Sequence, residues 1–134
     1  MKVFISHKFR GVDPDGLRED LETVAGLLEN GGHSTFIYFR DREQWMPQDF
    51  PPGEVIKEAF EELKNCDVVL ALVKHKAPSE GMLLELGFAK ALGKKVTLLI
   101  SEDCCPTFLE AISDQVIKFD SLEDIGESLG DLAF

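Results

Sequence analysis

Cysteine is scarce in this sequence, with only Cys66, Cys104 and Cys105 among 134 residues. An odd number with two adjacent members does not build the paired framework of a disulfide-rich domain. No cysteine or histidine pair has the spacing of zinc ligands. We therefore expect neither disulfide bonds nor a metal site, and no residue pattern indicates a cofactor.

Long apolar runs are also missing, since no segment approaches the roughly 20 apolar residues of a membrane-spanning helix. The first residues, MKVFISHKF, lead directly into a strand pattern and lack the charged and then apolar segments of a signal peptide. These features predict a cytoplasmic protein without membrane contacts.

Basic residues are few, with 14 Lys and Arg against 25 Asp and Glu and a formal net charge of −11. Nucleic acids and anionic membranes attract basic surfaces, so both are excluded as partners. Six of the 14 basic residues nevertheless gather in three loops. These loops contain Lys8 and Arg10 with His7, then Arg40 and Arg42, then Lys74 and Lys76 with His75.

Five β-branched or aromatic runs predict strands at residues 2–6, 34–39, 67–73, 95–100 and 116–119. Helical patterns occupy residues 14–30, 52–65 and 79–92, a short segment after Pro106, and residues 121–132. For the first helix we expect Asp13 as N-cap, Pro14 at the first position and Gly31 as the stop.

This alternation, with apolar central strands, predicts a doubly wound five-stranded parallel sheet in a three-layer α/β/α domain. The most common order is the flavodoxin-like 2-1-3-4-5, in which ligands bind outside the carboxyl ends of strands 1 and 3. The length and the 44% hydrophobic content predict one domain over residues 1–134. Two of the basic loops, residues 7–13 and 74–78, flank the predicted binding position.

Glu85 is the ionisable residue of the run GMLLELGFA, on the helix that follows the second of these loops. Its helical neighbours at three and four positions are Gly81, Met82, Phe88 and Ala89, so it does not lie on a polar face. A buried carboxylate without a partner costs several kcal/mol, which marks Glu85 as an active-site candidate. The alternative is a carboxylate that leans toward water or pairs with a distant Lys or Arg.

The loop at residues 40–51 is long for such a connection and contains Trp45, Met46 and Phe50. Aromatic rings beside a crevice can stack on a nucleobase, which makes Trp45 a candidate for substrate binding. Alternatively, the aromatic side chains only fasten the loop to the body of the domain.

The segment SEGMLLELGFAKALGKKVTLLI, residues 79–100, resembles the signature of the nucleoside 2-deoxyribosyltransferase family and the related 2′-deoxynucleoside 5′-monophosphate N-glycosidases. In both groups a helix with Glu-Leu-Gly follows a strand and a turn, and a Gly-Lys pair precedes the next strand. The N-terminal strand with its loop and the stretch SDQVIKF, residues 113–119, extend the resemblance over most of the chain.

The resemblance implies that Glu85 attacks the anomeric carbon of a deoxyribosyl group and forms a glycosyl-enzyme intermediate. Transfer to a second base would make the protein a transferase, and attack by water would make it a hydrolase. The resemblance also implies a homo-oligomer, a dimer or higher, in which subunits complete each other's sites.

The serine at position 79 makes this segment resemble the nucleotide-hydrolysing branch of the family. Ser79 could present its hydroxyl and backbone N–H to a 5′-phosphate, with Gly81 beside it. It could equally be a plain N-cap. In the first loop Ser6, His7, Lys8 and Arg10 resemble the family's Ser and Arg phosphate contacts, and solvated loop charge is the alternative.

Two positions depart from the family pattern. Ala59 stands where family members usually carry an Asp that orients the sugar or the departing base, and we expect Glu58 to substitute for it. Leu83 replaces a Gly two residues before the nucleophile, which narrows the expected sugar site.

Two other functions stay open. The start of the chain, with Phe4, Ile5, Ser6, Arg10 and Gly11, is also similar to TIR domains, which implies cleavage of NAD. Alternatively, the absence of the Asp at position 59 suits a noncatalytic module that binds a nucleotide or a partner protein.

Overall fold

The computed structural model describes residues 1–8, 10–74, 79–104, 108–126 and 129. Within these residues, one parallel sheet contains β1 (Lys2–Ser6), β2 (Ser34–Ile37), β3 (Val68–Val73), β4 (Lys95–Ser101) and β5 (Gln115–Phe119). The strand order is β2-β1-β3-β4-β5, which confirms the flavodoxin-like topology. The direction of winding therefore reverses between β1 and β3.

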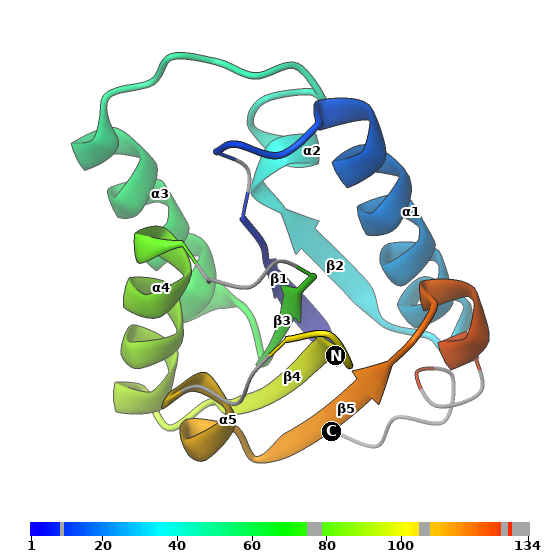
Figure 1. Cartoon of the computed structure of the whole chain (residues 1–134). Helices are drawn as coiled ribbons and strands as arrows, with labels where there is room; N and C mark the ends of the chain where they lie inside the picture. Colours follow the sequence, from blue (N-terminus) through cyan, green and yellow to red (C-terminus); the bar gives the residue numbers. More distant parts are fainter. Residues whose placement is uncertain (9, 75–78, 105–107, 127–128, 130–134) are drawn as a thin grey trace.

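Helices cover both faces of the sheet and complete three layers (Figure 1). One face carries α1 (Pro14–Asn30) and the 3-10 helix η1 (Leu122–Ile125), and the other carries α3 (Pro52–Asn65), α4 (Glu80–Ala91) and α5 (Phe108–Ile112). A short helix, α2 (Tyr38–Asp41), follows β2 directly.

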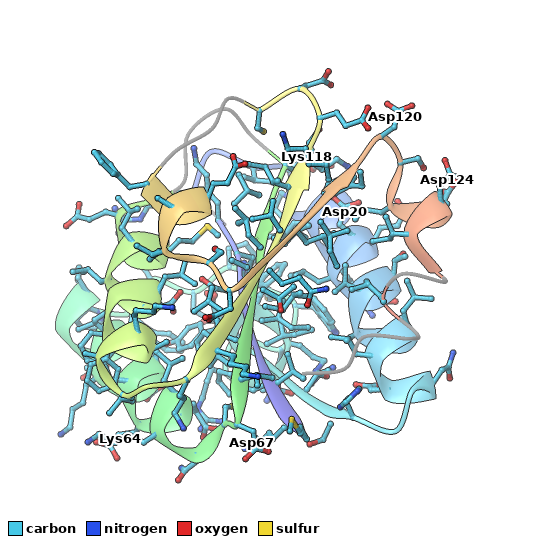
Figure 2. The ribbon with its side chains drawn as sticks, turned by 90° about the horizontal axis from the view of Figure 1, so that it is seen from below. Asp20, Lys64, Asp67, Lys118, Asp120 and Asp124 are labelled. Atoms are coloured by element: carbon cyan, nitrogen blue, oxygen red, sulfur yellow. The ribbon has the colours of Figure 1, made fainter. Side chains whose placement is uncertain are left out.

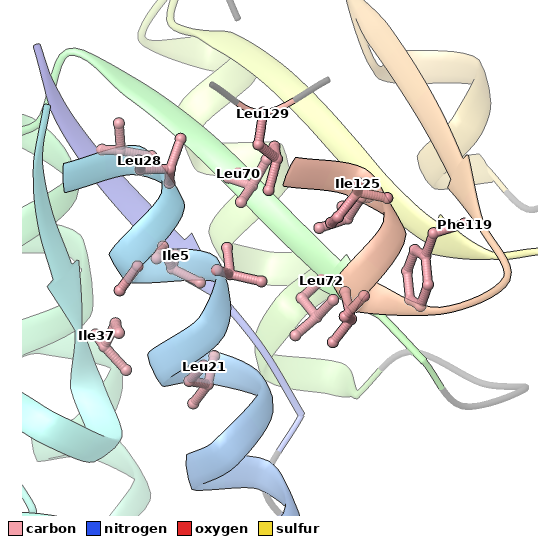
Figure 3. Close-up of a cluster of buried hydrophobic side chains, with 14 of the residues drawn as sticks. Ile5, Leu21, Leu28, Ile37, Leu70, Leu72, Phe119, Ile125 and Leu129 are labelled. Carbon is pink, nitrogen blue, oxygen red and sulfur yellow. The ribbon is translucent and has the colours of Figure 1, made fainter. Parts of the chain in front are cut away.

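The central strands bury both of their faces, which explains why they are apolar throughout. In β3, Leu70 and Leu72 pack with α1 and η1 (Figure 3), whereas Val69 and Ala71 belong to the cluster beneath α3 and α4. Successive strand residues point to opposite faces, so a strand covered on both sides cannot alternate with polar residues.

The first helix begins and ends where its sequence predicts. The Asp13 carboxylate accepts a hydrogen bond from the Gly16 N–H at 3.1 Å, and Pro14 occupies the first turn. The helix ends at Asn30, and Gly31 caps it. The next residue, Gly32, has a φ of 91°, a conformation that glycine adopts without a steric penalty.

The second strand is shorter than its sequence predicts, because Tyr38 and Phe39 form the first turn of α2. The Asp41 carboxylate accepts a hydrogen bond from the Ile37 N–H at 2.9 Å and so stabilises the turn. For the last predicted helix, residues 121–132, the structure shows the 3-10 helix η1. Residues 127–128 and 130–132 of that prediction lie outside the described residues.

Figure 2 shows the two ends of the sheet, with Asp67 and Lys64 at one end and Asp120, which follows β5, at the other. At the amino end, the Asp67 carboxylate accepts a hydrogen bond from the Lys2 N–H at 2.8 Å. In the described part of the chain, no helix is both long and apolar enough to cross a membrane.

Candidate active site

A cavity of about 550 Å³ lies beside the carboxyl end of β1, next to the point where the winding of the sheet reverses. It is lined by residues from β1 and its loop, from the segment after β2, from α3 and from the start of α4. This volume is in the range that holds a small-molecule ligand. A cavity therefore occupies the predicted ligand-binding position, and Glu85 is part of the cavity wall.

Glu85 is held by a residue from the other side of the winding reversal. The Ser6 hydroxyl, at the end of β1, donates a hydrogen bond to Glu85 Oε1 at 2.7 Å. Burial raises the pKa of Glu85 to about 7, and the Ser6 hydrogen bond opposes that rise. The carboxyl group can therefore change its protonation state near neutral pH, as a catalytic acid, base or nucleophile must.

The start of α4 brings Ser79 and Gly81 into the same cavity wall. Ser79 is the N-cap, and its Oγ accepts a hydrogen bond from the Met82 N–H at 3.2 Å. Ser79 therefore caps the helix, which is one of its two alternative roles, and it also lines the cavity.

In the first loop, Arg10 and His7 line the cavity, and Lys8 is partly buried outside the lining. His7 is 6% exposed, and burial lowers its pKa to about 4, so its ring is neutral at physiological pH. Arg10 is exposed and is the cationic side chain that the cavity wall contains among the described residues.

In the second and third basic loops, the described Lys and Arg side chains pair with carboxylates. Arg40 pairs with Asp41 at 2.9 Å, and Lys74 pairs with Asp20 at 3.0 Å. Arg42 pairs with Glu62 at 2.9 Å. The predicted residues His75 and Lys76 lie outside the described residues.

Glu58 lies beside the cavity and not in its lining. Its side chain is 47% exposed and contacts the guanidinium of Arg42 at 3.6 Å, and the Tyr38 hydroxyl donates to it at 3.4 Å. Tyr38 itself lines the cavity, and its burial, with Glu58 nearby, raises its pKa to about 12. Ala59 contributes an apolar, buried patch of wall.

Trp45 is partly buried outside the cavity lining and packs against the core cluster beneath α1. Its ring meets Phe39 edge to face at 5.4 Å between centroids, and the Arg18 guanidinium lies 5.1 Å from its centre. This arrangement favours the alternative in which the aromatic residue fastens the loop. Phe50, from the same loop, does line the cavity.

Glu43 also lines the cavity, and sequence patterns give no sign of its position. It is 3% exposed, although it stands in the polar run RDREQ, which is typical of a solvated loop. Its Oε2 accepts a hydrogen bond from the Gln48 N–H at 2.8 Å, and burial raises its pKa. Only the path of the chain after α2 turns this side chain inward.

The described residues contain no group of three or more Cys, His, Asp or Glu side chains arranged to hold a metal ion. The site as described is built from carboxyl, hydroxyl, aromatic and guanidinium groups, with neutral His7.

Two solved structures share this fold. The Clostridium botulinum CMP N-glycosidase BcmB superimposes with a TM-score of 0.70 at 22% identity, over 96% of this chain and 97% of that one. A 2-deoxyribosyltransferase from Bacillus psychrosaccharolyticus has a TM-score of 0.71 at 22% identity, over 100% of this chain and 93% of that one. A comparison with curated proteins found no match.

The sequence profile of nucleoside 2-deoxyribosyltransferases matches residues 15–111, more than half of the chain. The match includes Glu85, Ser79 and the helix that Ser79 caps. The chain therefore belongs to the nucleoside 2-deoxyribosyltransferase family, whose enzymes act on the N-glycosidic bonds of nucleosides and nucleotides.

Proposed function

We propose that this protein cleaves or transfers the N-glycosidic bond of a 2′-deoxynucleoside or its 5′-monophosphate, with Glu85 as the nucleophile. The observation that carries the proposal is the placement of Glu85. Its Oε1 accepts a hydrogen bond from Ser6 at 2.7 Å, and Glu85 lines a cavity of about 550 Å³, a volume typical of small-molecule sites.

In the proposed reaction, the ionised Glu85 attacks the anomeric carbon with Oε2, because Oε1 is bonded to Ser6. The bond between this carbon and the base breaks, its electron pair leaves with the base, and the base takes up a proton. A glycosyl-enzyme ester remains. Water or a second base then attacks the same carbon, loses a proton and releases the carboxylate.

The pKa of Glu85 suits this role. A carboxyl group with a pKa of about 7 is ionised in part at neutral pH and is more basic than an exposed carboxylate. The Ser6 hydroxyl donates to the ionised form and fixes its orientation. Glu58 would act through Tyr38, which it contacts at 3.4 Å, as a positioning residue.

A 5′-phosphate would lie at the start of α4. The first N–H groups of a helix have no intrahelical acceptor and favour anions. Ser79 and Gly81, at the start of α4, line the cavity, and Arg10 lines the same cavity. Ser79 precedes Glu85 by six residues, about 9 Å along the helix axis. Helical side chains lean toward the N-terminus, which brings the Glu85 carboxylate nearer to the phosphate position. Lys8 would add positive potential from the first loop.

We also propose that the protein is a homo-oligomer. On α4, Leu83 and Leu84 are 46% and 49% exposed, and Leu84 borders the cavity. A second copy packed on this side of α4 would cover both side chains and close the site. Sedimentation of the wild type and of the Leu83→Asp variant tests this proposal. A wild-type dimer or larger species that is lost in the variant supports it, and a monomeric wild type contradicts it.

The proposed chemistry is tested by chromatographic detection of free base. The wild type and Glu85→Gln are incubated with deoxynucleosides, deoxynucleoside 5′-monophosphates, ribonucleotides and NAD. We expect base release from a deoxy substrate by the wild type and none from the variant. Release by both proteins would contradict the role of Glu85, and consumption of NAD alone would favour the TIR-like activity.

A further inference from the structure

Tyr38 contributes a polar atom to a side of the cavity whose other side chains are apolar. The lining residues that come from α3 have no side-chain hydrogen-bonding group: Pro52, Val55, Ile56 and Ala59. Tyr38, at the start of α2, lines the same cavity and packs in the buried cluster that contains Ala59. Of these five side chains, only that of Tyr38 can form a hydrogen bond with a ligand.

The Tyr38 hydroxyl lies at the edge of this packed cluster. The residue is 5% exposed, and its hydroxyl donates a hydrogen bond to Glu58 Oε2 at 3.4 Å. Because the Glu58 side chain is 47% exposed, the hydroxyl lies where the buried cluster ends. Burial, with Glu58 nearby, raises the pKa of Tyr38 to about 12, so the hydroxyl keeps its proton at neutral pH. The proton is directed at Glu58, and the oxygen can still accept a hydrogen bond.

A chain of ion pairs holds Glu58 in this position. Arg42 Nε lies 3.6 Å from Glu58 Oε2, the same oxygen that the Tyr38 hydroxyl contacts. Arg42 Nη2 donates to Glu62 at 2.9 Å, and Lys2 contacts the other oxygen of Glu62 at 3.3 Å. Single exposed ion pairs contribute little to stability, but a connected series fixes the orientation of its members.

The stereochemistry of the substrate directs its 3′-hydroxyl toward the helices that carry Glu85 and Glu58. In a natural nucleoside the base and the 3′-hydroxyl lie on opposite faces of the sugar ring. A nucleophile that attacks in line with the departing base approaches from the face of the 3′-hydroxyl. Glu85 is on α4, and α3 packs directly beside α4, where the Phe60 and Phe88 rings stack at 4.1 Å between centroids. The 3′-hydroxyl therefore points toward the side of the cavity that these two helices form.

We infer that the Tyr38 hydroxyl accepts a hydrogen bond from the 3′-hydroxyl of the substrate, with Glu58 as its positioning residue. The bases present their donors at different places, whereas every 2′-deoxynucleoside carries the 3′-hydroxyl at the same place, so one acceptor serves all of them. Donation to a carboxylate polarises the Tyr38 oxygen and makes it a better acceptor.

This inference rests on the proposed function, because it narrows the substrate class of the same cavity. The substrate is a nucleoside or 5′-monophosphate with an unmodified 3′-hydroxyl. A nucleotide whose 3′-oxygen carries a phosphate lacks the donor, and its charge would lie near the Glu58 carboxylate, which repels it.

The test compares kcat/KM for dCMP, dTMP, dAMP and dGMP with that for their 2′,3′-dideoxy counterparts, in the wild type and in Tyr38→Phe. Loss of the 3′-hydroxyl also changes the intrinsic reactivity of the glycosidic bond, by the same factor in both proteins. The change in the ratio between the proteins therefore measures the contact. A neutral hydrogen bond contributes roughly 3- to 10-fold, so the ratio should fall by this factor in Tyr38→Phe. Base release with the same ratio in both proteins would overturn the inference and leave the proposed function intact.

Three variants of α3 test the positioning role of Glu58. Glu58→Ala should lower the ratio, whereas Glu58→Gln keeps an oxygen that accepts from Tyr38 and should stay near the wild-type ratio. Glu61→Ala is the matched control, because Glu61 is on the same helix, its side chain is 63% exposed and it is outside the lining. An equal fall in Glu58→Ala and Glu61→Ala would overturn this role.

Binding separates a failure of this inference from a failure of the proposed function. The same nucleotide pairs are titrated by calorimetry into Glu85→Gln and into the double variant Glu85→Gln with Tyr38→Phe. If the wild type releases no base, but Glu85→Gln binds the deoxy member roughly 3- to 10-fold more tightly and the double variant does not, the proposed function fails and the inference stands. Equal affinities within every pair, or no binding of any of these nucleotides, would overturn the inference.

NMR gives a direct readout, because Tyr38 is the only tyrosine in the chain. In Glu85→Gln labelled at the tyrosine Cζ, one resonance reports on the Tyr38 hydroxyl. The deoxy ligand should move this resonance further than its dideoxy counterpart does. Equal displacement by both ligands would contradict the contact.

Discussion

Ser6 and Glu85 lie 79 positions apart in the sequence and meet through a hydrogen bond of 2.7 Å. One stands at the end of β1 and the other on the helix after β3, so their contact spans the point where the winding of the sheet reverses. Ser6, which holds the proposed nucleophile, thus comes from β1, the strand that pairs with β3 in the sheet.

We expect Ser6→Ala to shift the activity profile toward higher pH. The Ser6 hydrogen bond lowers the pKa of Glu85, so its loss raises that pKa and delays ionisation of the nucleophile. At neutral pH, kcat/KM should fall about tenfold, the effect of one hydrogen bond to a charged group. A pH profile of kcat/KM measures the shift. Ser101→Ala removes another buried serine from a strand end and should keep the wild-type profile. A profile unmoved by Ser6→Ala would contradict this role.

Glu85→Gln should stabilise the fold at alkaline pH. The pKa of about 7 in the folded protein exceeds the ordinary pKa of a glutamate side chain, 4.5, so Glu85 loses its proton at lower pH in the unfolded chain than in the folded protein. Glu85 therefore lowers the free energy of unfolding increasingly between about pH 5 and pH 8. Because Glu85 is partly exposed, solvent reduces this effect. The free energy of unfolding of the variant, relative to the wild type, should rise by on the order of 2 kcal/mol over this pH range. Urea unfolding at both pH values checks it, and an equal stability difference at the two would refute the burial argument.

Ser79 offers a way to separate capping from phosphate binding. Ser79→Asp keeps a good N-cap but places a negative charge beside the proposed phosphate, so KM for a 5′-monophosphate should rise at least about tenfold, while KM for the nucleoside changes little. Ser79→Ala loses the cap at about 1 kcal/mol of stability, and it should weaken binding of the monophosphate more than binding of the nucleoside. Equal effects on both ligands in both variants would leave Ser79 as a cap alone.

Gln44→Gly should stabilise the protein by about 0.5 to 1 kcal/mol, because glycine adopts a φ of 54° without strain. Thermal unfolding measures the change. Gln48→Gly is the matched control, since Gln48 is also exposed but has no positive φ, and glycine there should be neutral or destabilising. If both variants destabilise equally, the turn at Gln44 stores no strain.

Much of the fold and one essential part of the site could be predicted from local patterns. Apolar runs such as VVLALV mark strands buried on both faces, and Asp13, Pro14 and Gly31 mark the ends of a helix, because these preferences act between near neighbours. Glu85 could be singled out because its helical neighbours are apolar. The predicted end of the second strand, at residue 39, was wrong, and β2 ends at Ile37. The hydrogen bond from the Ile37 N–H to the Asp41 carboxylate stabilises a helical turn, which outweighs the strand preference of Tyr38 and Phe39.

Local sequence patterns are enough to predict the succession of strands and helices and the position of one unusual carboxylate, Glu85. The side chains that surround Glu85 depend on how distant segments pack. Trp45 packs against the core cluster beneath α1, whereas Glu43, two positions earlier in a polar run, is buried in the cavity wall. Ser6 reaches Glu85 from a different strand. Periodicity records which face of its own element a residue occupies, whereas loop conformation and contacts across the sheet depend on how distant elements pack.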